Sequence, residues 1–156
     1  MSISEHIAKH LREVYFGGNW TVSSVKEHLE DVTWQQSIEK IDSFNTIAAL
    51  VFHMNFYVQI ASRVMDGEPI NTSDKYSFDL PPINSSTDWE NMVNQMWADV
   101  EKLASQIERL PDNKLSEIFF HEKYKTYYRN LHGIIEHTHY HLGQIVLVKK
   151  MLASRK

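Results

Sequence analysis

The sequence predicts an all-α protein, a four-helix bundle with a long crossover between its second and third long helices. Three observations support this fold class. Glycine and proline are scarce, with 5 and 4 in 156 residues, so long segments run without helix breakers. Apolar residues recur at spacings of three and four in four of these segments. One connection between them is too long for a tight turn. A chain of this length fits one domain, and we expect a single domain over residues 1–156.

The first long helix is predicted over residues 2–15 and stops at the pair Gly17-Gly18, since glycine commonly ends a helix. Its apolar face consists of Ile3, Ile7, Leu11 and Val14. The segment 20–41 follows. Ser23 or Ser24 and then Thr33 are candidate N-caps for two short helices in it.

The second long helix is predicted to begin at Asp42 or Ser43 and to end at Met65, before Asp66-Gly67. Its apolar stripe contains Ile47, Leu50, Val51, Met54, Tyr57, Val58, Ala61 and Met65. Residues 68–86 then form a linker with three prolines. A linker of this length crosses the bundle or covers a site.

The third long helix is predicted to begin at a cap on Ser86 or Thr87, where Glu90 completes a capping-box pattern, and to stop before Pro111. A second connection covers about residues 111–125. The last helix is predicted from about residue 126 to 152 and is followed by a basic tail, which complements the helix dipole.

Charge and composition exclude several classes of protein. The formal net charge is -4 and the basic residues are dispersed, so we expect no nucleic-acid partner. The longest apolar stretches, such as 47–52, are too short to span a bilayer, and the N-terminus has no signal-peptide pattern. We therefore expect a cytoplasmic protein without membrane contact. Cysteine is absent, so any metal must bind to nitrogen and oxygen ligands.

Nine histidines are the unusual feature of the composition. Each residue turns an α-helix by about 100°, which places His141 inside the apolar stripe of the last helix and His137 at its edge. His139 points to the opposite face. His137 and His141 are four residues apart, so their imidazoles lie on neighbouring turns and can share one ion. Hydrogen bonds could also satisfy two core-facing histidines, and that alternative stays open.

His53 is the candidate third ligand. It is the only Asp, Glu, His, Lys or Arg between Asp42 and Arg63, and it lies at the edge of the apolar stripe of its helix. A lone histidine in such a segment is more often a hydrogen-bonded core residue. An inward pair on another helix weakens that interpretation, because it would supply two further ligands and facing helices of a bundle commonly build metal sites. On the residues alone, a shared metal site and hydrogen-bonded histidines are about equally supported.

The remaining histidines are weaker candidates. His6 and His10 are also four residues apart, but they lie near a terminus, where we expect a surface feature. His28 and His121 lie in connecting segments without partners. A di-iron carboxylate site needs two inward Glu-x-x-His motifs, and the one motif here, Glu136 to His139, faces outward. The sequence also has no zinc-protease, serine-hydrolase or phosphate-loop motif.

The run from Gly133 to Ile145, with two histidines four apart before Gly143-Gln144, resembles the last-helix signature of the DinB/YfiT-like metalloenzyme superfamily. The apolar approach to His53, the Trp20 before a short helix and the long linker are also similar to this family. The resemblance covers essentially the whole chain. It implies a four-helix bundle, a divalent metal on His53, His137 and His141, and a homodimer.

In some members of the family the metal activates a low-molecular-weight thiol such as bacillithiol, mycothiol or glutathione. The resemblance therefore implies transferase or isomerase reactions of such a thiol. Together with the three inward histidines, it leads us to expect a thiol-transferase-like or hydrolase-like enzyme with a small-molecule substrate. Imidazole ligands suit zinc, nickel, copper and iron, so the sequence does not identify the metal. Gln144 and Tyr57 are candidates to orient a ligand ring or the bound species. The alternative is a non-enzymatic bundle whose histidines or metal serve folding or dimer assembly.

Overall fold

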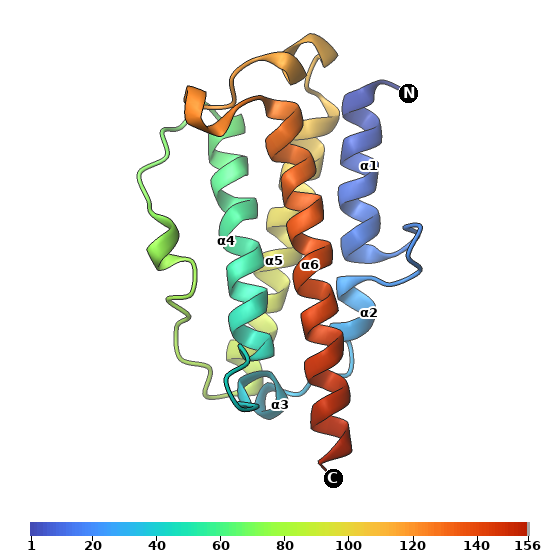
Figure 1. Ribbon diagram of the computed structural model, residues 1–156, viewed down its shortest axis with the longest axis vertical. Coiled ribbons are helices and arrows are strands. Elements are labelled where there is room, and N and C mark those ends of the chain that lie inside the picture. Colours follow the sequence, from blue (N-terminus) through green and yellow to red (C-terminus); the bar gives the residue numbers. More distant parts are fainter. Residues whose placement is uncertain (156) are drawn as a thin grey trace.

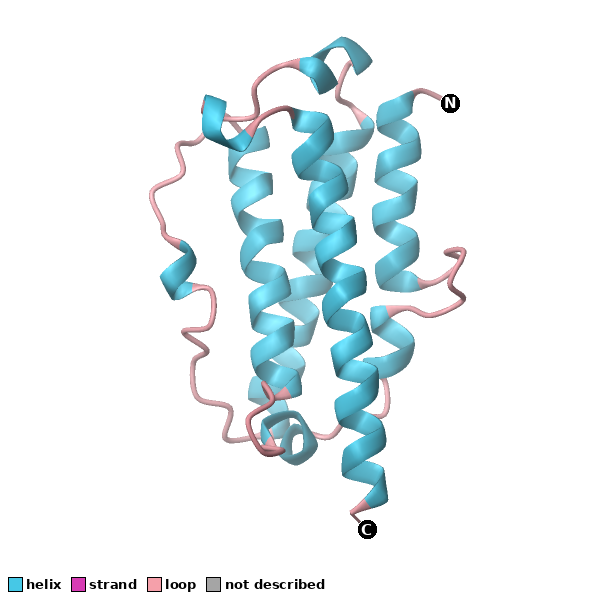
Figure 2. Ribbon diagram, in the orientation of Figure 1, coloured by secondary structure: helices cyan, strands magenta, loops and turns pink. Residues whose placement is uncertain are grey.

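The computed structural model describes residues 1–155 and confirms the predicted fold class (Figures 1 and 2). Within these residues it contains helices and no strand beyond one isolated bridge, between Ile118 and Thr126. The four long helices are α1 (Ile3–Phe16), α4 (Ile47–Met65), α5 (Ser86–Glu108) and α6 (Tyr127–Ser154). Helix α5 packs against α1 and α4, and α6 packs against the same two helices. The four therefore enclose one common core.

The directions of the long helices explain the crossover. Figure 1 shows α1 and α6 running one way, and α4 and α5 running the other way. Since α4 and α5 are consecutive and parallel, the chain between them returns along the whole length of the bundle. This crossover, residues 66–85, contains only the short helix η1 (Asp74–Tyr76).

Shorter helices close the two ends of the bundle. Helices α2 (Val25–Leu29) and α3 (Trp34–Ile38) lie between α1 and α4, and η2 (Asp112–Ser116) and η3 (Glu122–Tyr124) lie between α5 and α6. The predicted caps Ser24 and Thr33 are confirmed, since each side chain accepts a hydrogen bond from a backbone N–H in its first turn.

Two predicted helix starts were wrong. Helix α4 begins after Thr46, whose hydroxyl accepts the N–H of Ala49, and not at Asp42 or Ser43. Asp42 has a φ of 46°, a left-handed conformation that an α-helix cannot contain. Helix α5 is capped by Ser85. The capping-box pattern ending at Glu90 is therefore not used.

The core is mainly aliphatic, and it contains a buried polar pair. The Tyr15 side chain on α1 is completely buried, and its hydroxyl is hydrogen bonded to that of Thr138 on α6 at 3.2 Å. Burial raises the pKa of Tyr15 to about 12, so the phenol stays protonated and neutral. Thr138 also donates to the backbone oxygen of Ile134, so the pair leaves no unpaired hydroxyl between the two helices.

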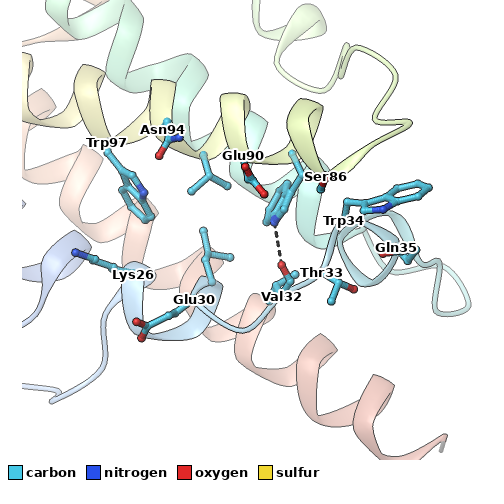
Figure 3. A pocket seen from close by; sticks show the side chains of 13 residues that line it. Lys26, Glu30, Val32, Thr33, Trp34, Gln35, Ser86, Glu90, Asn94 and Trp97 are labelled. Atoms are coloured by element: carbon cyan, nitrogen blue, oxygen red, sulfur yellow. Dashed lines mark hydrogen bonds between the residues drawn. The ribbon is translucent and has the colours of Figure 1, made fainter.

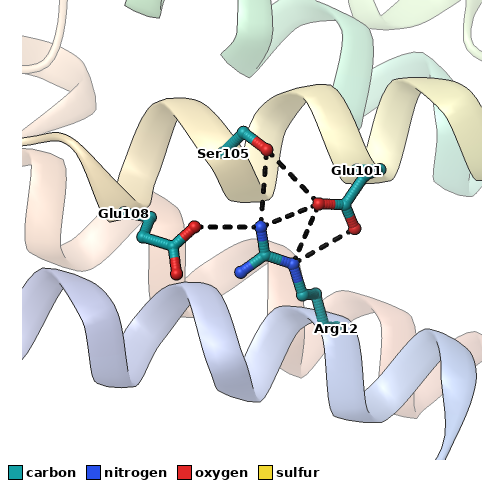
Figure 4. A network of polar contacts seen from close by, with 4 residues as sticks. All are labelled: Arg12, Glu101, Ser105 and Glu108. Atoms are coloured by element: carbon teal, nitrogen blue, oxygen red, sulfur yellow. Dashed lines mark hydrogen bonds and ion pairs between the residues drawn. The ribbon is translucent and has the colours of Figure 1, made fainter.

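Charged groups join α5 to its neighbours at the surface. Arg12 on α1 contacts both carboxylate oxygens of Glu101 and one of Glu108, as Figure 4 shows. The hydrogen bond to Glu101 is the main cause that raises the pKa of Arg12 further above its usual value. On the other side of α5, Asp99 accepts hydrogen bonds from Asn55 and Gln59 of α4. These contacts fix the positions of α1 and α4 against α5.

Among the described residues, no helix is both long enough and apolar enough to cross a membrane.

Candidate metal centre

The side chains of His53, His137 and His141 meet between α4 and α6. Their nearest ring nitrogens all lie within 4.8 Å of one another. The Nε2 atom of His137 is 3.0 Å from Nε2 of His53 and 2.9 Å from Nε2 of His141. His53 and His141 are buried, at 7% exposure each. The three residues singled out from the sequence are thus brought together, and they form the one group of three or more metal-ligand side chains found in residues 1–155.

The helices determine which histidines meet. The four-residue spacing of His137 and His141 puts them one above the other on the face of α6 that packs against α4. His139, two residues from each, is turned toward α1, where its ring lies 6.2 Å from that of His10. The outward assignment of His139 relative to the cluster is therefore correct.

Hydrogen bonds define which nitrogens carry protons in the cluster. The Nδ1 atom of His53 lies 3.3 Å from the backbone oxygen of Ser77, and that of His141 lies 2.6 Å from Oε1 of Gln144. Carbonyl and amide oxygens only accept, so both Nδ1 atoms carry the hydrogen. In the neutral rings, the Nε2 atoms of His53 and His141 then carry no hydrogen, and their lone pairs are directed at His137.

The protons available in the neutral cluster cannot satisfy it. A hydrogen on Nε2 of His137 can be given to His53 or to His141, but one N–H cannot serve two acceptors fully. At least one contact near 3 Å then joins two lone pairs. A cation between the three nitrogens removes this repulsion. The separations of 2.9 and 3.0 Å are less than twice a zinc–nitrogen bond of about 2.0–2.1 Å, so one ion can touch His137 together with either neighbour. All three nitrogens lie within 4.8 Å of one another, so a shift of a few tenths of an ångström at each ring, about the scale of rotamer adjustment, brings all three onto one ion. The donor set fits a divalent metal.

Burial keeps the three imidazoles neutral. Desolvation is the main cause that lowers the pKa of each histidine. For His137 the pKa falls to about 4, because desolvation disfavours its charged form and the neighbouring rings of His141 and His53 disfavour it further. Neutral imidazole is the form that binds a metal, so at neutral pH no proton has to be removed from these rings first.

The crossover covers the cluster with residues that the sequence did not single out. The ring of Phe78 stacks on that of His53, with centroids 3.9 Å apart and an angle of 9° between the planes. Ser77, the acceptor for His53, is 3% exposed. The sequence had one signal for this cover, the length of the linker, but that signal does not indicate which residues reach the histidines.

Tyr57 lies beside the cluster, one turn of α4 beyond His53. Its ring is edge-on to His53 at 5.2 Å and to His137 at 5.0 Å. Its hydroxyl donates to Asp74 of η1 at 3.3 Å and is thus directed at the crossover, not at the Nε2 atoms. Gln144 accepts from His141, as expected of a residue that orients a ligand ring.

Two depressions lie beside Tyr57, and the second of them reaches His137 of the cluster. One, of about 370 Å³, lies between α4, the crossover and η3, and contains the side chains of Asp74 and Lys123. The other, of about 320 Å³, is lined by Tyr57, His137 and Arg129 among others. Both include Asn130 and Ile134, so they are neighbouring parts of one concave region. A small molecule bound there would contact His137.

The family model of the DinB superfamily matches residues 8–145, a range that includes all three histidines and Gln144. No curated protein and no solved structure matches the chain.

Proposed function

The chain belongs to the DinB superfamily, and we propose that its three histidines bind one divalent metal ion that activates a water or a small thiol for attack on a substrate. The convergence of the three Nε2 atoms carries this proposal. The hydrogen bonds of His53 and His141 place the hydrogen on Nδ1 and leave a lone pair on each Nε2 atom. The Nε2 atom of His137 lies within 3.0 Å of both. Three protein ligands also leave a coordination position for a reactant, as in catalytic metal sites.

A divalent ion on neutral ligands keeps its full charge, and it lowers the pKa of a bound water or thiol toward neutrality. Zinc, nickel and iron all suit imidazole, and we propose one ion per chain without choosing among them. The protein's contribution is to hold the rings. Ser77 and Gln144 fix the orientation of two imidazoles, and Phe78 covers one of them.

The substrate side of the centre is the concave region around Tyr57, His137 and Arg129. The guanidinium of Arg129 and the ammonium of Lys123 add positive charge to this region, and Asp74 adds one negative charge. We therefore propose that a low-molecular-weight thiol or an electrophile with an anionic group binds here, beside His137.

Elemental analysis of protein purified without an affinity tag tests the metal directly. We expect about one equivalent of metal per chain. His53→Ala, His137→Ala and His141→Ala should each abolish it, whereas His139→Ala should keep it. A screen of small thiols against electrophiles, run with the metal-loaded protein, then tests for activity. Equal metal loss in His139→Ala would contradict the assignment of the ligands.

A structural role is the second candidate, and the contact between the crossover and His53 favours it. A metal that fixes His53 also fixes the crossover through Ser77 and Phe78. A fold that melts when the metal is chelated, together with no turnover in the thiol screen, would support this role. An apo-protein that stays folded supports the catalytic one.

The homodimer and the cytoplasmic location stay predictions. Gly143 is a candidate contact in a homodimer. A Cβ built on it meets no atom within 4 Å, so nothing within the chain itself requires glycine there. Sedimentation of wild type against Gly143→Leu tests whether another helix packs at this position. A dimer that dissociates in the variant supports the interface.

A further inference from the structure

A second concave site, away from the histidines, lies between α5 and the segment that contains α2 and α3 (Figure 3). Its volume is about 470 Å³. Three of the four tryptophans of the chain line it, namely Trp34, Trp89 and Trp97. None of its lining residues belongs to the metal centre or to the depressions beside it. We call this site the tryptophan cleft.

A hydrogen bond and aromatic packing hold two walls of the tryptophan cleft in place. The indole N–H of Trp89 donates to the backbone oxygen of Val32 at 3.0 Å, and its side chain is 5% exposed. The ring of Trp97 packs against Phe16 of α1 with centroids 5.5 Å apart. Figure 3 shows Trp97 at one end of the cleft and Trp34 at the other. The aromatic surfaces of Trp89 and Trp97 are therefore preformed.

The aliphatic side chains of Leu29 and Val93 also line the tryptophan cleft. Its charged groups are Lys26, Glu30 and Glu90. Figure 3 shows the two carboxylates on opposite sides, Glu30 beside α2 and Glu90 on α5. Within residues 1–155 neither carboxylate has a side-chain hydrogen bond or ion pair that would neutralise it. Two negative charges against one positive charge favour a cation over an anion.

We propose that the tryptophan cleft binds a small organic cation with an apolar body, such as a quaternary or alkylated ammonium compound. Indole faces attract such cations more strongly than other aromatic rings do. Glu30 and Glu90 supply the opposite charge on both sides, while Leu29 and Val93 accommodate the apolar part. A neutral ligand would use only the indole and aliphatic surfaces, and an anion would be repelled by both carboxylates. This proposal is independent of the metal centre.

Tryptophan fluorescence measures occupancy of the cleft directly. Trp20, the fourth tryptophan, is 96% exposed and lies outside the cleft, so a Trp20→Phe background leaves only the three cleft tryptophans as reporters. Benzyltrimethylammonium is the cationic probe, benzyl alcohol the neutral one and phenylacetate the anionic one. We expect saturable binding of the cation, with the other two binding about tenfold or more weakly.

Variants separate charge from aromatic contact. Glu30→Gln with Glu90→Gln keeps the shape of the cleft and should weaken binding of the cation about tenfold. The matched control changes Glu39 and Glu68, two exposed carboxylates outside the cleft, to Gln and should leave the affinity unchanged. Trp34→Leu removes one aromatic wall without touching the buried Trp89. This variant should weaken binding of the cation more than binding of benzyl alcohol.

Three results would overturn the proposal. The first is equal affinity for the cation and benzyl alcohol. The second is unchanged affinity in the double glutamine variant. The third is a dimer in sedimentation that buries the tryptophans and abolishes the response to the probe, since it would assign the cleft to a second copy of the chain. Circular dichroism of each variant confirms that a loss of binding is not a loss of fold.

Discussion

The Nδ1 atom of His141 lies 2.6 Å from the side-chain oxygen of Gln144, three residues further along α6. Because an amide oxygen can only accept, this contact places the hydrogen on Nδ1 and the lone pair on Nε2, which points to His137. The backbone oxygen of Ser77 does the same for His53. Both partners thus prepare an imidazole for a metal.

Removing the acceptor of His141 should therefore weaken metal binding. We expect Gln144→Ala to lower the affinity for zinc by about 10–100-fold, because the imidazole loses the contact that fixes its tautomer and orientation. Gln144→Glu should restore most of the affinity, since a carboxylate accepts the same hydrogen and makes the ring more basic. Competition with a chromogenic chelator measures both. Equal affinities of wild type and Gln144→Ala would show that Gln144 only packs.

Phe78 should contribute to the same affinity from the crossover. Phe78→Ala removes the ring stacked on His53 and admits water to that side of the imidazole. We expect zinc to bind roughly tenfold more weakly. Phe44→Ala is the matched control, because Phe44 and Phe78 are both 44% exposed and Phe44 contacts none of the three histidine rings closely enough to stack. A similar loss in the two variants would argue against a specific role of Phe78.

The bundle and its inward histidines could be predicted because helical periodicity is a local property. Residues 137, 139 and 141 differ by 200° in successive steps, so the sequence alone separates the middle histidine from the other two. His53 needed one further assumption, that its helix faces the last helix. The packing of α4 against α6 supplies that contact.

The cover of the site could not be predicted in the same way. Ser77 and Phe78 lie in irregular chain, which has no period from which to derive a direction. Their positions depend on the whole length of the crossover. The predicted start of α4 was wrong for a related reason. Asp42, Ser43 and Thr46 are all good capping residues, and the choice of Thr46 follows from the path of residues 42–45.

The buried hydroxyl pair of Tyr15 and Thr138 should stabilise the bundle. Tyr15→Phe keeps the ring in the core but removes its hydrogen bond to Thr138, and we expect a loss of about 1 kcal/mol in the free energy of unfolding. Urea denaturation measures it. Tyr140→Phe is the control, because Tyr140 is 67% exposed on α6 and should cost almost nothing. Equal losses would show that the buried pair is not the cause.

Asp112 should make the stability of the folded state depend on pH in the acidic range. Its carboxylate accepts the N–H groups of Ser4 and Ile3 at 2.9 Å, and these hydrogen bonds lower its pKa below the usual value. A lowered carboxyl pKa stabilises the folded state above the unfolded pKa, near 3.9, and the contribution is lost as pH falls through the lower folded value. We expect Asp112→Asn to have a lower Tm than wild type at pH 7.

The difference in Tm between Asp112→Asn and wild type should shrink as the pH falls below the unfolded pKa, near 3.9, and the wild-type carboxylate takes up a proton as well. Thermal unfolding followed by circular dichroism between pH 2.5 and 7 tests this, at roughly half-unit steps. Asp79→Asn, a change of the same kind in the exposed part of the crossover, should give a constant and small difference. A pH-independent deficit in Asp112→Asn would mean that charge is not what Asp112 contributes.

Removal of the metal should loosen the crossover before it affects the bundle. Without an ion, two lone pairs of the cluster face each other near 3 Å, so the rings are expected to separate. His53 then loses its fixed position, and with it the contacts to Ser77 and Phe78. The aliphatic core and the Arg12 contacts do not involve the histidines, so the four long helices should persist.

Hydrogen exchange with and without a chelator at pH 7 distinguishes loosening of the crossover from loosening of the whole bundle. Amides of residues 74–78 should exchange about tenfold faster in the apo-protein, while far-UV circular dichroism stays unchanged. The segment 112–116 is the internal control, because Asp112 fastens it to α1 without any part of the metal centre. Faster exchange in both segments would mean general destabilisation. Exchange that is unchanged in residues 74–78 would show that the crossover holds His53 in place without a metal.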